Sequence, residues 1–497
     1  MRKGSITVYL SLSLLLLLSL ITAGLYSARQ AAGRVLLASG TEQALFSVFG
    51  QYDRDLLDMY GLLFMDAGYG GSKLLPGHLL HEIEQEAEYI LKPAKGLLSV
   101  GRDPVGARLH EHEDAITGYA LATDDGGRAF RRQICEVMQK KMGPAGLLFL
   151  QQRLDGLQQI VDMQQRDYET YGEENAEQYY QEDRQMFGPV YTPVKETETE
   201  YGTVREIDTD ALPQIPNPLS TIYDMQTAGV LRAVLPEAWK VSYADVTSLT
   251  PVTKRTLQKG MNMAADDWEG SGEKLLLLEY LVRNFSCYTS EEKEKGKGLQ
   301  YEIEYAIGGE MSDRENLQDV LFQLLLIREA TNFLFLMKDM TKRQEVDSVA
   351  NIISMLLMVP EAAPVISFAL KAAWAYGESI LDLRNLLDGK KVQLIKDESS
   401  WQLPLRSLIF IRMTGNTHRH TSDSGLDYKE YLRLLLFLKN ADSLTGSLMD
   451  LVEWNVRQEK ERPDFRLDTC VDALRVELHA AVGRNEYTIE RSYGYNA

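Results

Sequence analysis

Residues 1–34 read MRKGSITVYLSLSLLLLLSLITAGLYSARQAAGR, and this stretch decides how the rest of the chain is arranged. No charged residue lies between Lys3 and Arg29, and the apolar run from Ile6 to Leu25 is 20 residues long. A helix rises about 1.5 Å per residue, so a run of this length crosses the roughly 30 Å of hydrocarbon in a bilayer. The sequence therefore predicts a transmembrane helix here.

The flanking charges set the orientation of this helix. Arg2 and Lys3 precede it with the amino terminus, and although Arg29 and Arg34 follow, the rule for short loops and first helices favours a cytoplasmic N-terminus. The alternative is a cleaved signal peptide, whose apolar region usually has about 7–15 residues, and residues 22–24 offer a mediocre cleavage site. In both cases the bulk is extracytoplasmic, and the length favours a single-pass anchor in the cell membrane.

Composition limits the remaining possibilities. A chain of 497 residues has room for two or three domains, and its three cysteines lack the spacing of a metal cluster. The formal net charge of −19 argues against nucleic acid as a partner, because phosphate binding needs a basic surface.

The pattern stays helical beyond the span. Apolar residues recur at three- or four-residue steps, and no proline occurs before Pro76, which predicts one long helix or two nearly collinear helices as a stalk over residues 28–70. Gly24, Ala28 and Ala32 are four residues apart, which makes a smooth stripe where a second helix can approach. Ordinary use of small residues near a membrane interface is the alternative.

The stretch YDRDLLDMYG follows, and four of its residues are expected to pack the junction onto the outer domain: Tyr52, Leu56, Met59 and Tyr60. Asp53, Asp55 and Asp58 resemble a cation site, but the oxygen-rich loop and turn glycine of a calcium hand are missing.

Several segments together carry a resemblance to a known family. Five segments resemble an uncharacterised family of membrane proteins of Gram-positive bacteria: KGSITVYLSLSLLLLLSLI, SARQAAGRVLLASGTEQALFSVFGQYDRDLLDMYGLLFMD, EYAIGGEMSDRENLQDVLFQLLLIREATNFLF, AAWAYGESILDLRNLLDGKKVQLIK and DYKEYLRLLLFL. Genes of that family often lie beside tight-adherence (Tad, Flp-type) pilus loci. The N-terminus is similar to minor pilin-like proteins of the TadE and TadG type.

One departure from pilins follows from this resemblance. Prepilin processing cuts after a glycine and uses a glutamate five residues further on, where this chain has Tyr9 after Gly4. No acidic residue occurs before Glu42, so the resemblance implies an accessory protein or an uncleaved anchor, not a major pilin subunit.

The outer part divides into two predicted regions: a mainly helical region over 71–215 and an α+β extracytoplasmic domain over 216–497, after the cytoplasmic tip and span at 1–27. Residues 166–210 hold thirteen acidic and four basic residues, which predicts a solvated loop or an edge hairpin, with cation binding as the alternative. Six tyrosines in this segment could mark a partner surface. LPQIPNPLS then indicates a linker.

The second region carries the clearest local signals. GEKLLLLEYLVRNFSCY predicts a helix or a buried strand, YEIEYAIGG predicts a half-buried strand, and Ser312 with Glu315 predicts a helix start with a capping box. Residues 321–337 and 352–370 are apolar enough to raise the question of a second span, but internal charges and Pro360 with Pro364 favour buried helices.

The rest of this region continues in the same way. A long helix ends near Gly389, KVQLIK predicts a short strand, and residues 427–459 predict one or two helices. Alternation on both sides of AVGRN predicts a closing antiparallel hairpin. The expected fold class is α+β and mainly helical, with short antiparallel strands.

No catalytic motif is found. HLLHE lacks the arrangement of zinc proteases, and GSGEK has the wrong glycine spacing for a phosphate loop, so we expect no catalytic residue, no cofactor and no metal. The sequence favours an outward-facing pilin-like accessory or scaffold of a Tad-type apparatus, with membrane lipid and, through the N-terminal helix, pilin-like or Tad-apparatus membrane proteins as partners. The alternative is an envelope hydrolase or ligand-binding protein for which the helix is a tether alone.

Overall fold

The computed structural model describes residues 2–91, 105–110, 114–186, 194–199, 202–207, 222, 225–226, 229–235, 241–263, 272–290, 298–410 and 425–495. Contacts divide the chain into two compact units. Unit 1 comprises residues 1–140, 250–273 and 448–497, and unit 2 comprises residues 141–249 and 274–447. Each unit is therefore assembled from segments that are separated in the sequence.

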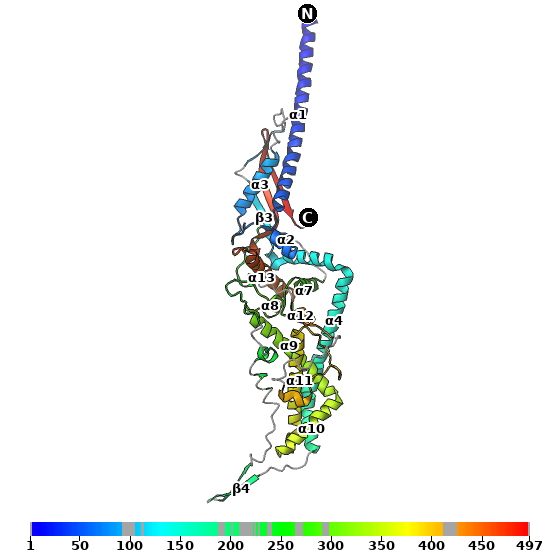
Figure 1. Cartoon of the computed structure of the whole chain (residues 1–497). Helices are drawn as coiled ribbons and strands as arrows, with labels where there is room; N and C mark the ends of the chain where they lie inside the picture. Colours follow the sequence, from blue (N-terminus) through cyan, green and yellow to red (C-terminus); the bar gives the residue numbers. More distant parts are fainter. Residues whose placement is uncertain are drawn as a thin grey trace. The chain divides into compact units, whose positions relative to one another are not determined.

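Unit 1 is built around a long C-terminal strand. Strand β6 (Cys470–Val482) pairs antiparallel with four others: β1 (Met65–Asp66), β2 (Ala107–Leu109), β3 (Ala115–Leu121) and β7 (Asn485–Gly494). The second half of α1 (Arg2–Phe49) and the helix α3 (Pro76–Leu91) pack on this sheet (Figure 1), with α2 (Arg54–Tyr60) following α1. Their core includes Ala44, Val48, Ile83, Leu474 and Leu478, all fully buried. The predicted C-terminal hairpin is confirmed.

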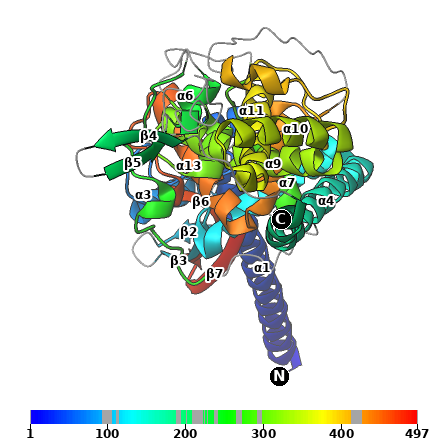
Figure 2. The same ribbon diagram turned by 90° about the horizontal axis from the view of Figure 1, so that it is seen from below.

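Unit 2 is mainly helical. Its main helices are α7 (Glu273–Asn284), α8 (Glu302–Gly308), α9 (Asp313–Lys338), α10 (Met340–Leu356), α11 (Ala363–Leu387) and α12 (Tyr428–Leu438), with shorter turns α6 (Val230–Val234), η4 (Pro360–Ala362) and η5 (Leu405–Phe410). Figure 2 shows α9, α10 and α11 lying together. The expected class, mainly helical α+β with a small antiparallel sheet, is confirmed.

The helices α4 (Asp124–Met186) and α13 (Ala441–Glu459) each cross a boundary between the units in sequence, and the short turns η3 (Val252–Lys254) and η6 (Leu467–Thr469) belong to unit 1. Residues 427–459 thus form two helices, α12 and α13, one of the two predicted outcomes. GEKLLLLEYLVRNFSCY contains the helix α7, which settles that alternative in favour of a helix.

The strand predicted at residues 301–309 is wrong, because this segment forms α8. Alternation predicts a strand when one face is solvated, yet the residues from Glu302 to Ile307 are all buried. The Glu302 and Glu304 carboxylates accept hydrogen bonds from the backbone N–H groups of Ser286 and Tyr288, both at 2.8 Å. Each bond gives one buried carboxylate of this helix a backbone donor.

Two further predictions need correction. KVQLIK forms no strand, since Val392 makes an isolated bridge with Leu426. Within the acidic segment, residues 166–186 continue α4, so the expected loop is wrong there, whereas β4 (Val194–Thr199) and β5 (Gly202–Ile207) form the predicted hairpin. The linker LPQIPNPLS lies outside the described residues.

Candidate membrane and helix-packing site

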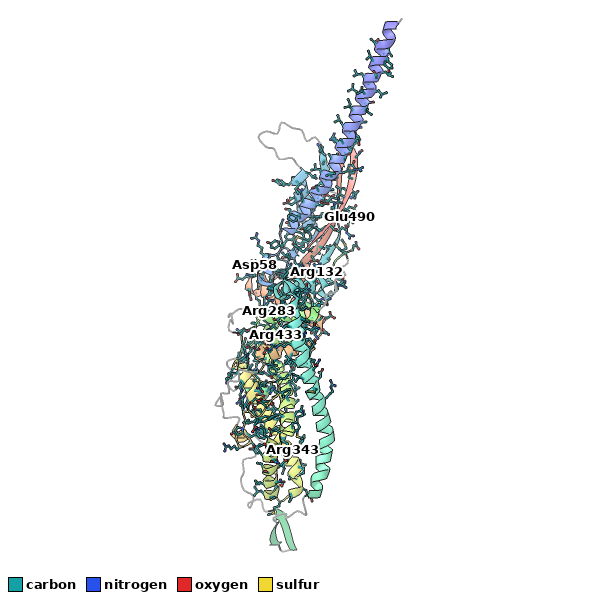
Figure 3. All side chains as sticks on the ribbon, turned by 90° about the vertical axis from the view of Figure 1, so that its right-hand side faces the viewer. Asp58, Arg132, Arg283, Arg343, Arg433 and Glu490 are labelled. Carbon is teal, nitrogen blue, oxygen red and sulfur yellow. The ribbon has the colours of Figure 1, made fainter. Side chains whose placement is uncertain are left out.

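Helix α1 is unbroken from Arg2 to Phe49, and its first half is long and apolar enough to cross a membrane. None of its apolar window is buried within the protein. In Figure 3 the side chains of this half project on all sides, away from the sheet that Glu490 of β7 marks. Helix α9 is also long and apolar enough to cross a membrane, but 56% of its apolar stretch is buried within the protein.

Four hydroxyl groups in the apolar half donate hydrogen bonds within the helix. Ser11, Ser13 and Ser19 each donate to the carbonyl oxygen three residues earlier, at 2.8–3.0 Å, and Thr22 donates to Leu18 at 2.9 Å. A free polar group in hydrocarbon is costly, so these bonds suit the helix to a lipid environment.

The stripe of Gly24, Ala28 and Ala32 is exposed. A Cβ atom added at Gly24 would have no other atom within 4 Å. At about 100° per residue, the stripe points roughly half a turn away from the positions that pack on the body, such as Gly33, Leu37 and Ala44. The smooth face is thus directed away from unit 1's own core.

The opposite face of α1 fits closely onto the sheet. A Cβ atom added at Gly33 would come 2.6 Å from a methyl group of Val482, so only glycine fits at this position. The Gln30 side-chain amide donates to the Val482 carbonyl oxygen at 3.0 Å and accepts from the Tyr487 hydroxyl at 2.6 Å. The close approach and the buried hydrogen bonds fix the rotation of α1 about its own axis.

The end of α1 is fixed in the same way. The Tyr495 hydroxyl donates to the Phe49 carbonyl oxygen at 2.7 Å, and the Phe49 ring lies 5.0 Å from that of Tyr493. Arg491 of β7 donates to Glu42 at 2.8 Å. The C-terminal strand therefore contacts α1 along the second half of the helix.

The junction residues lie in and next to α2. Leu56 and Tyr60 are buried, whereas Tyr52 and Met59 are half-buried. Asp53 caps α2 by accepting from the Leu56 N–H at 3.0 Å, and Gly61 ends the helix in a left-handed conformation. This cap was not predicted from the sequence, although an aspartate three residues before Leu56, at the start of a helix, is a typical N-cap.

Three acidic residues at the junction pair with one arginine. Arg462 donates to Asp53 at 2.6 Å, to Asp55 at 3.1 Å and to Asp66 at 2.8 Å, while Asp58 is exposed. The guanidinium occupies the place that a cation would need. Sequence reasoning missed this cluster because Arg462 lies about 400 residues from its partners.

The described residues hold no group of three or more His, Cys, Asp or Glu side chains arranged for a metal ion. His78 and His81 lie next to Glu82 and Glu84, at 3.8 and 3.7 Å, as pairs on the surface of α3. Burial raises the pKa of the Cys135 thiol to about 12, which keeps it protonated and unreactive at neutral pH.

Comparison with known proteins places the second region in a family. The model of a family of unknown function, DUF5702, matches residues 209–482. Neither the curated proteins nor the solved structures include a match. Because the matched region covers more than half of the 497 residues, the chain belongs to this family of unknown function, DUF5702.

Proposed function

We propose that this protein is a single-pass membrane scaffold with its bulk outside the cell membrane, a pilin-like accessory of a Tad-type pilus or secretion apparatus. The observation that carries the proposal is the continuity of α1, which has a fully exposed apolar half and a second half packed into unit 1. A helix shared in this way transmits its orientation directly to the body it carries.

A simple tether has no need of this arrangement. An enzyme held at a membrane works equally well on a flexible linker, because its substrate approaches from solution. Here Gly33 and Gln30 lock the helix against the β6–β7 turn. The rotation of the span about its axis is coupled to that of the sheet, which favours a scaffold over the alternative of a tethered hydrolase or ligand-binding domain.

The stripe supplies the expected contact. Gly24, Ala28 and Ala32 face away from the packed side of α1, so a second helix can approach without disturbing unit 1. The N-terminal resemblance to TadE- and TadG-type proteins gives pilin-like helices of the same membrane as the expected partners. An N-terminus in the cytoplasm, from the charge asymmetry at Arg2 and Lys3, places the body outside.

The test replaces the stripe in full-length protein within its native host. Changing Gly24, Ala28 and Ala32 together to Leu should abolish co-purification with the host's pilus components, because bulky side chains prevent close helix approach. The matched control changes Ala23, Ser27 and Ala31 to Leu; these residues are also exposed and four apart, about 100° around the helix. Loss in the first variant and retention in the control supports the proposal.

A second variant separates scaffold from tether. Replacing residues 6–25 by a foreign transmembrane helix should prevent pilus assembly if the span itself makes contacts. Assembly that survives both the foreign span and the leucine stripe would rule out the scaffold function and leave the helix as an anchor.

A further inference from the structure

Strand β7 forms an outer edge of the sheet in unit 1. It pairs with β6 along its full length, from Asn485 to Gly494, without a shift in register. Among the described residues, no other strand pairs with β7. The other edge of the sheet differs, because Tyr119 of β3 exchanges two backbone hydrogen bonds with Met261, both at 2.9 Å. The chain itself therefore occupies the edge at β3, whereas the edge at β7 is open.

The register identifies the backbone groups that point outward from β7. A two-residue turn joins Val482 to Asn485, so the odd-numbered residues of β7 bond to β6 and the even-numbered residues direct their N–H and C=O groups away from it. The outward residues are Glu486, Thr488, Glu490 and Ser492. Within the described ranges, these backbone groups have one partner, Arg491, which donates to the Glu490 carbonyl oxygen at 2.8 Å. An edge of this kind is a template for a further strand.

The solvent face of this edge is acidic. Glu486 and Glu490 are both exposed, and the side chain of Glu490 keeps 57% of its surface accessible. Glu490 lies directly opposite Glu477 of β6, which is an unfavourable pair of like charges. Arg475, at 3.8 Å, offsets the charge of Glu490 in part. Because side chains directly opposite each other in a sheet interact, a further strand with Lys or Arg facing Glu486 and Glu490 fits this face. Figure 3 marks Glu490 on β7.

The other face of the edge is bordered by α1. The ring of Phe46 lies beside that of Tyr493, with centroids 6.1 Å apart, and Phe46 is 65% exposed. Glu42, one turn earlier on the same face of α1, pairs with Arg491 of β7. Phe46 and Glu42 thus lie over β7 on the exposed side of α1. The side chains that an added strand directs to this face would lie beside Phe46, so apolar residues fit there.

The direction of α1 argues against a second copy of this chain as the occupant. Helix α1 runs along β7 in the same direction, since Gln30 contacts Tyr487 and Phe49 contacts Tyr495. Identical edges related by a two-fold axis pair antiparallel, which would point the two α1 helices in opposite directions. Under the proposed function both helices span one membrane in the same orientation. The preference for a different protein as the partner rests on that orientation.

We propose that the outer edge of β7 is a docking site for an extended segment of another protein, which adds a strand to the sheet. The segment carries Lys or Arg toward Glu486 and Glu490, and apolar residues toward Phe46. A β-strand places alternate side chains on opposite faces, so the expected sequence alternates basic and apolar residues. Main-chain hydrogen bonds to the outward groups of β7 supply affinity, and the alternate side chains supply specificity.

Peptide binding to the full-length protein tests this inference. The protein is held in nanodiscs of neutral phosphatidylcholine, and the probe is a short fluorescent peptide of alternating Lys and Val, followed by anisotropy. This peptide should bind about tenfold more tightly than a Glu–Val peptide of the same length, because two opposed charge pairs change from attractive to repulsive. N-methylation of the peptide amides should abolish binding, since it removes the main-chain donors.

Charge exchange then locates the site. Glu486→Lys combined with Glu490→Lys should reverse the preference, so that the Glu–Val peptide binds more tightly than the Lys–Val peptide. The matched control makes the same change of charge at two other exposed acidic residues of unit 1, Asp58→Lys with Asp464→Lys. This control should keep the preference of the wild type.

A substitution in β7 tests the backbone contribution. Thr488→Pro removes an outward N–H group that does not bond to β6, so the ladder between β6 and β7 should persist. Its affinity for the Lys–Val peptide should fall several-fold, whereas Thr488→Val keeps the N–H group and should bind like the wild type. The N-methylated peptide makes the same test on an unaltered protein.

Four results would overturn the proposal. They are absence of binding by the Lys–Val peptide, equal binding after N-methylation, a reversed preference in the Asp58→Lys, Asp464→Lys control, and a disulfide-linked dimer of Thr488→Cys. That dimer would identify a second copy as the occupant, because the native cysteines are buried. The variant with Gly24, Ala28 and Ala32 changed to Leu should bind the Lys–Val peptide normally, so its loss of pilus components leaves this inference intact.

Discussion

The two units differ in how their buried charges connect the chain. In unit 1, arginines join segments that are far apart in sequence: Arg132 contacts Asp472 at 3.1 Å, and Arg255 contacts Glu453 and Asp468 at 2.5 and 2.7 Å. Together with Arg462 and Asp53, these pairs hold the N-terminal helices, a middle segment and the C-terminal strand in one unit.

Unit 2 contains a fully buried charge cluster whose members lie closer together in the sequence. Arg328 of α9 and Asp382 of α11 are both fully buried and 2.8 Å apart. Lys396, almost fully buried, contacts Glu378 at 2.5 Å and Asp382 at 2.7 Å. These pairs in unit 1 therefore join segments hundreds of residues apart, whereas the cluster in unit 2 joins α9, α11 and the residues just after α11.

The largest expected effect follows from removing Arg328. Besides Asp382, its guanidinium donates to the carbonyl oxygens of Gln393 and Leu394, at 2.9 and 2.8 Å. Arg328→Met leaves these acceptors and a buried carboxylate poorly compensated, which should lower the free energy of unfolding of unit 2 by about 3–5 kcal/mol. Hydrogen–deuterium exchange should show the loss of protection in α9, α11 and α12.

The control for this variant is Arg283→Met. Arg283 is half exposed, and its buried partner Glu279 keeps a second arginine, Arg433, at 3.0 Å, so the removal of Arg283 should change stability by about 1 kcal/mol or less. If Arg328→Met also exposes β6 and β7 to exchange as strongly as α9, then the two units unfold together, and the contrast between them does not extend to their stability.

A second effect concerns the pH dependence of unit 2. Glu304 is fully buried, accepts from the Tyr428 hydroxyl at 2.9 Å and has one carboxylate oxygen with no hydrogen-bond partner. Desolvation by burial raises the pKa of Glu304 to about 7, with the nearby Asp313 carboxylate adding to the rise. The native state therefore keeps the proton up to pH values at which the unfolded chain has lost it.

The direction of the pH effect follows from this difference. Between pH about 4.5 and 7 the native state binds more protons than the unfolded state, so stability falls as pH rises through this window, by on the order of 3 kcal/mol. Glu304→Gln should remove this slope and make the protein more stable than wild type at pH 8. Denaturation of the wild type and of Glu304→Gln at pH 5, 6, 7 and 8 measures the pH dependence of stability. The control is Glu310→Gln, at an exposed position.

Some elements could be predicted because their causes are local. Ser312 accepts from the Glu315 N–H at 3.3 Å, and its hydroxyl donates to the Glu315 carboxylate at 2.9 Å, so a four-residue pattern marks the start of α9. The C-terminal hairpin follows from alternation and from Gly483 at the turn, which has a positive φ of 69°.

The remainder depends on contacts that no local pattern contains. The apolar run around Ile352 predicted buried helices. Composition does not reveal which residues of these helices face outward, and in the structure the large apolar residues do. Likewise, the sequence shows that Arg328 is a charged residue within an apolar helix. It does not show which residue pairs with Arg328, because the partner Asp382 lies 54 residues further along the chain. Of the candidate site, the stripe and the junction residues could be named from sequence, but the sheet on which α1 packs could not.

The smallest expected effect tests the long-range closure of unit 1. Gly33→Val puts a branched side chain where even a Cβ atom would lie 2.6 Å from Val482, so α1 must move away from the β6–β7 turn. Overpacking of this kind costs about 1–3 kcal/mol, and the hydrogen bond from Gln30 to the Val482 carbonyl oxygen should weaken with it. Faster hydrogen exchange at the β6–β7 turn measures the change.

Gly24→Val is the matched control, because it makes the same substitution on the same helix where no other atom lies within 4 Å. Adding Val482→Ala to Gly33→Val should recover part of the lost protection, since it removes the methyl groups that clash. If Gly33→Val and Gly24→Val behave alike, then α1 does not pack tightly on the sheet. In that case the rotation of the span is not coupled to the body, and the main reason to prefer a scaffold over a tether is lost.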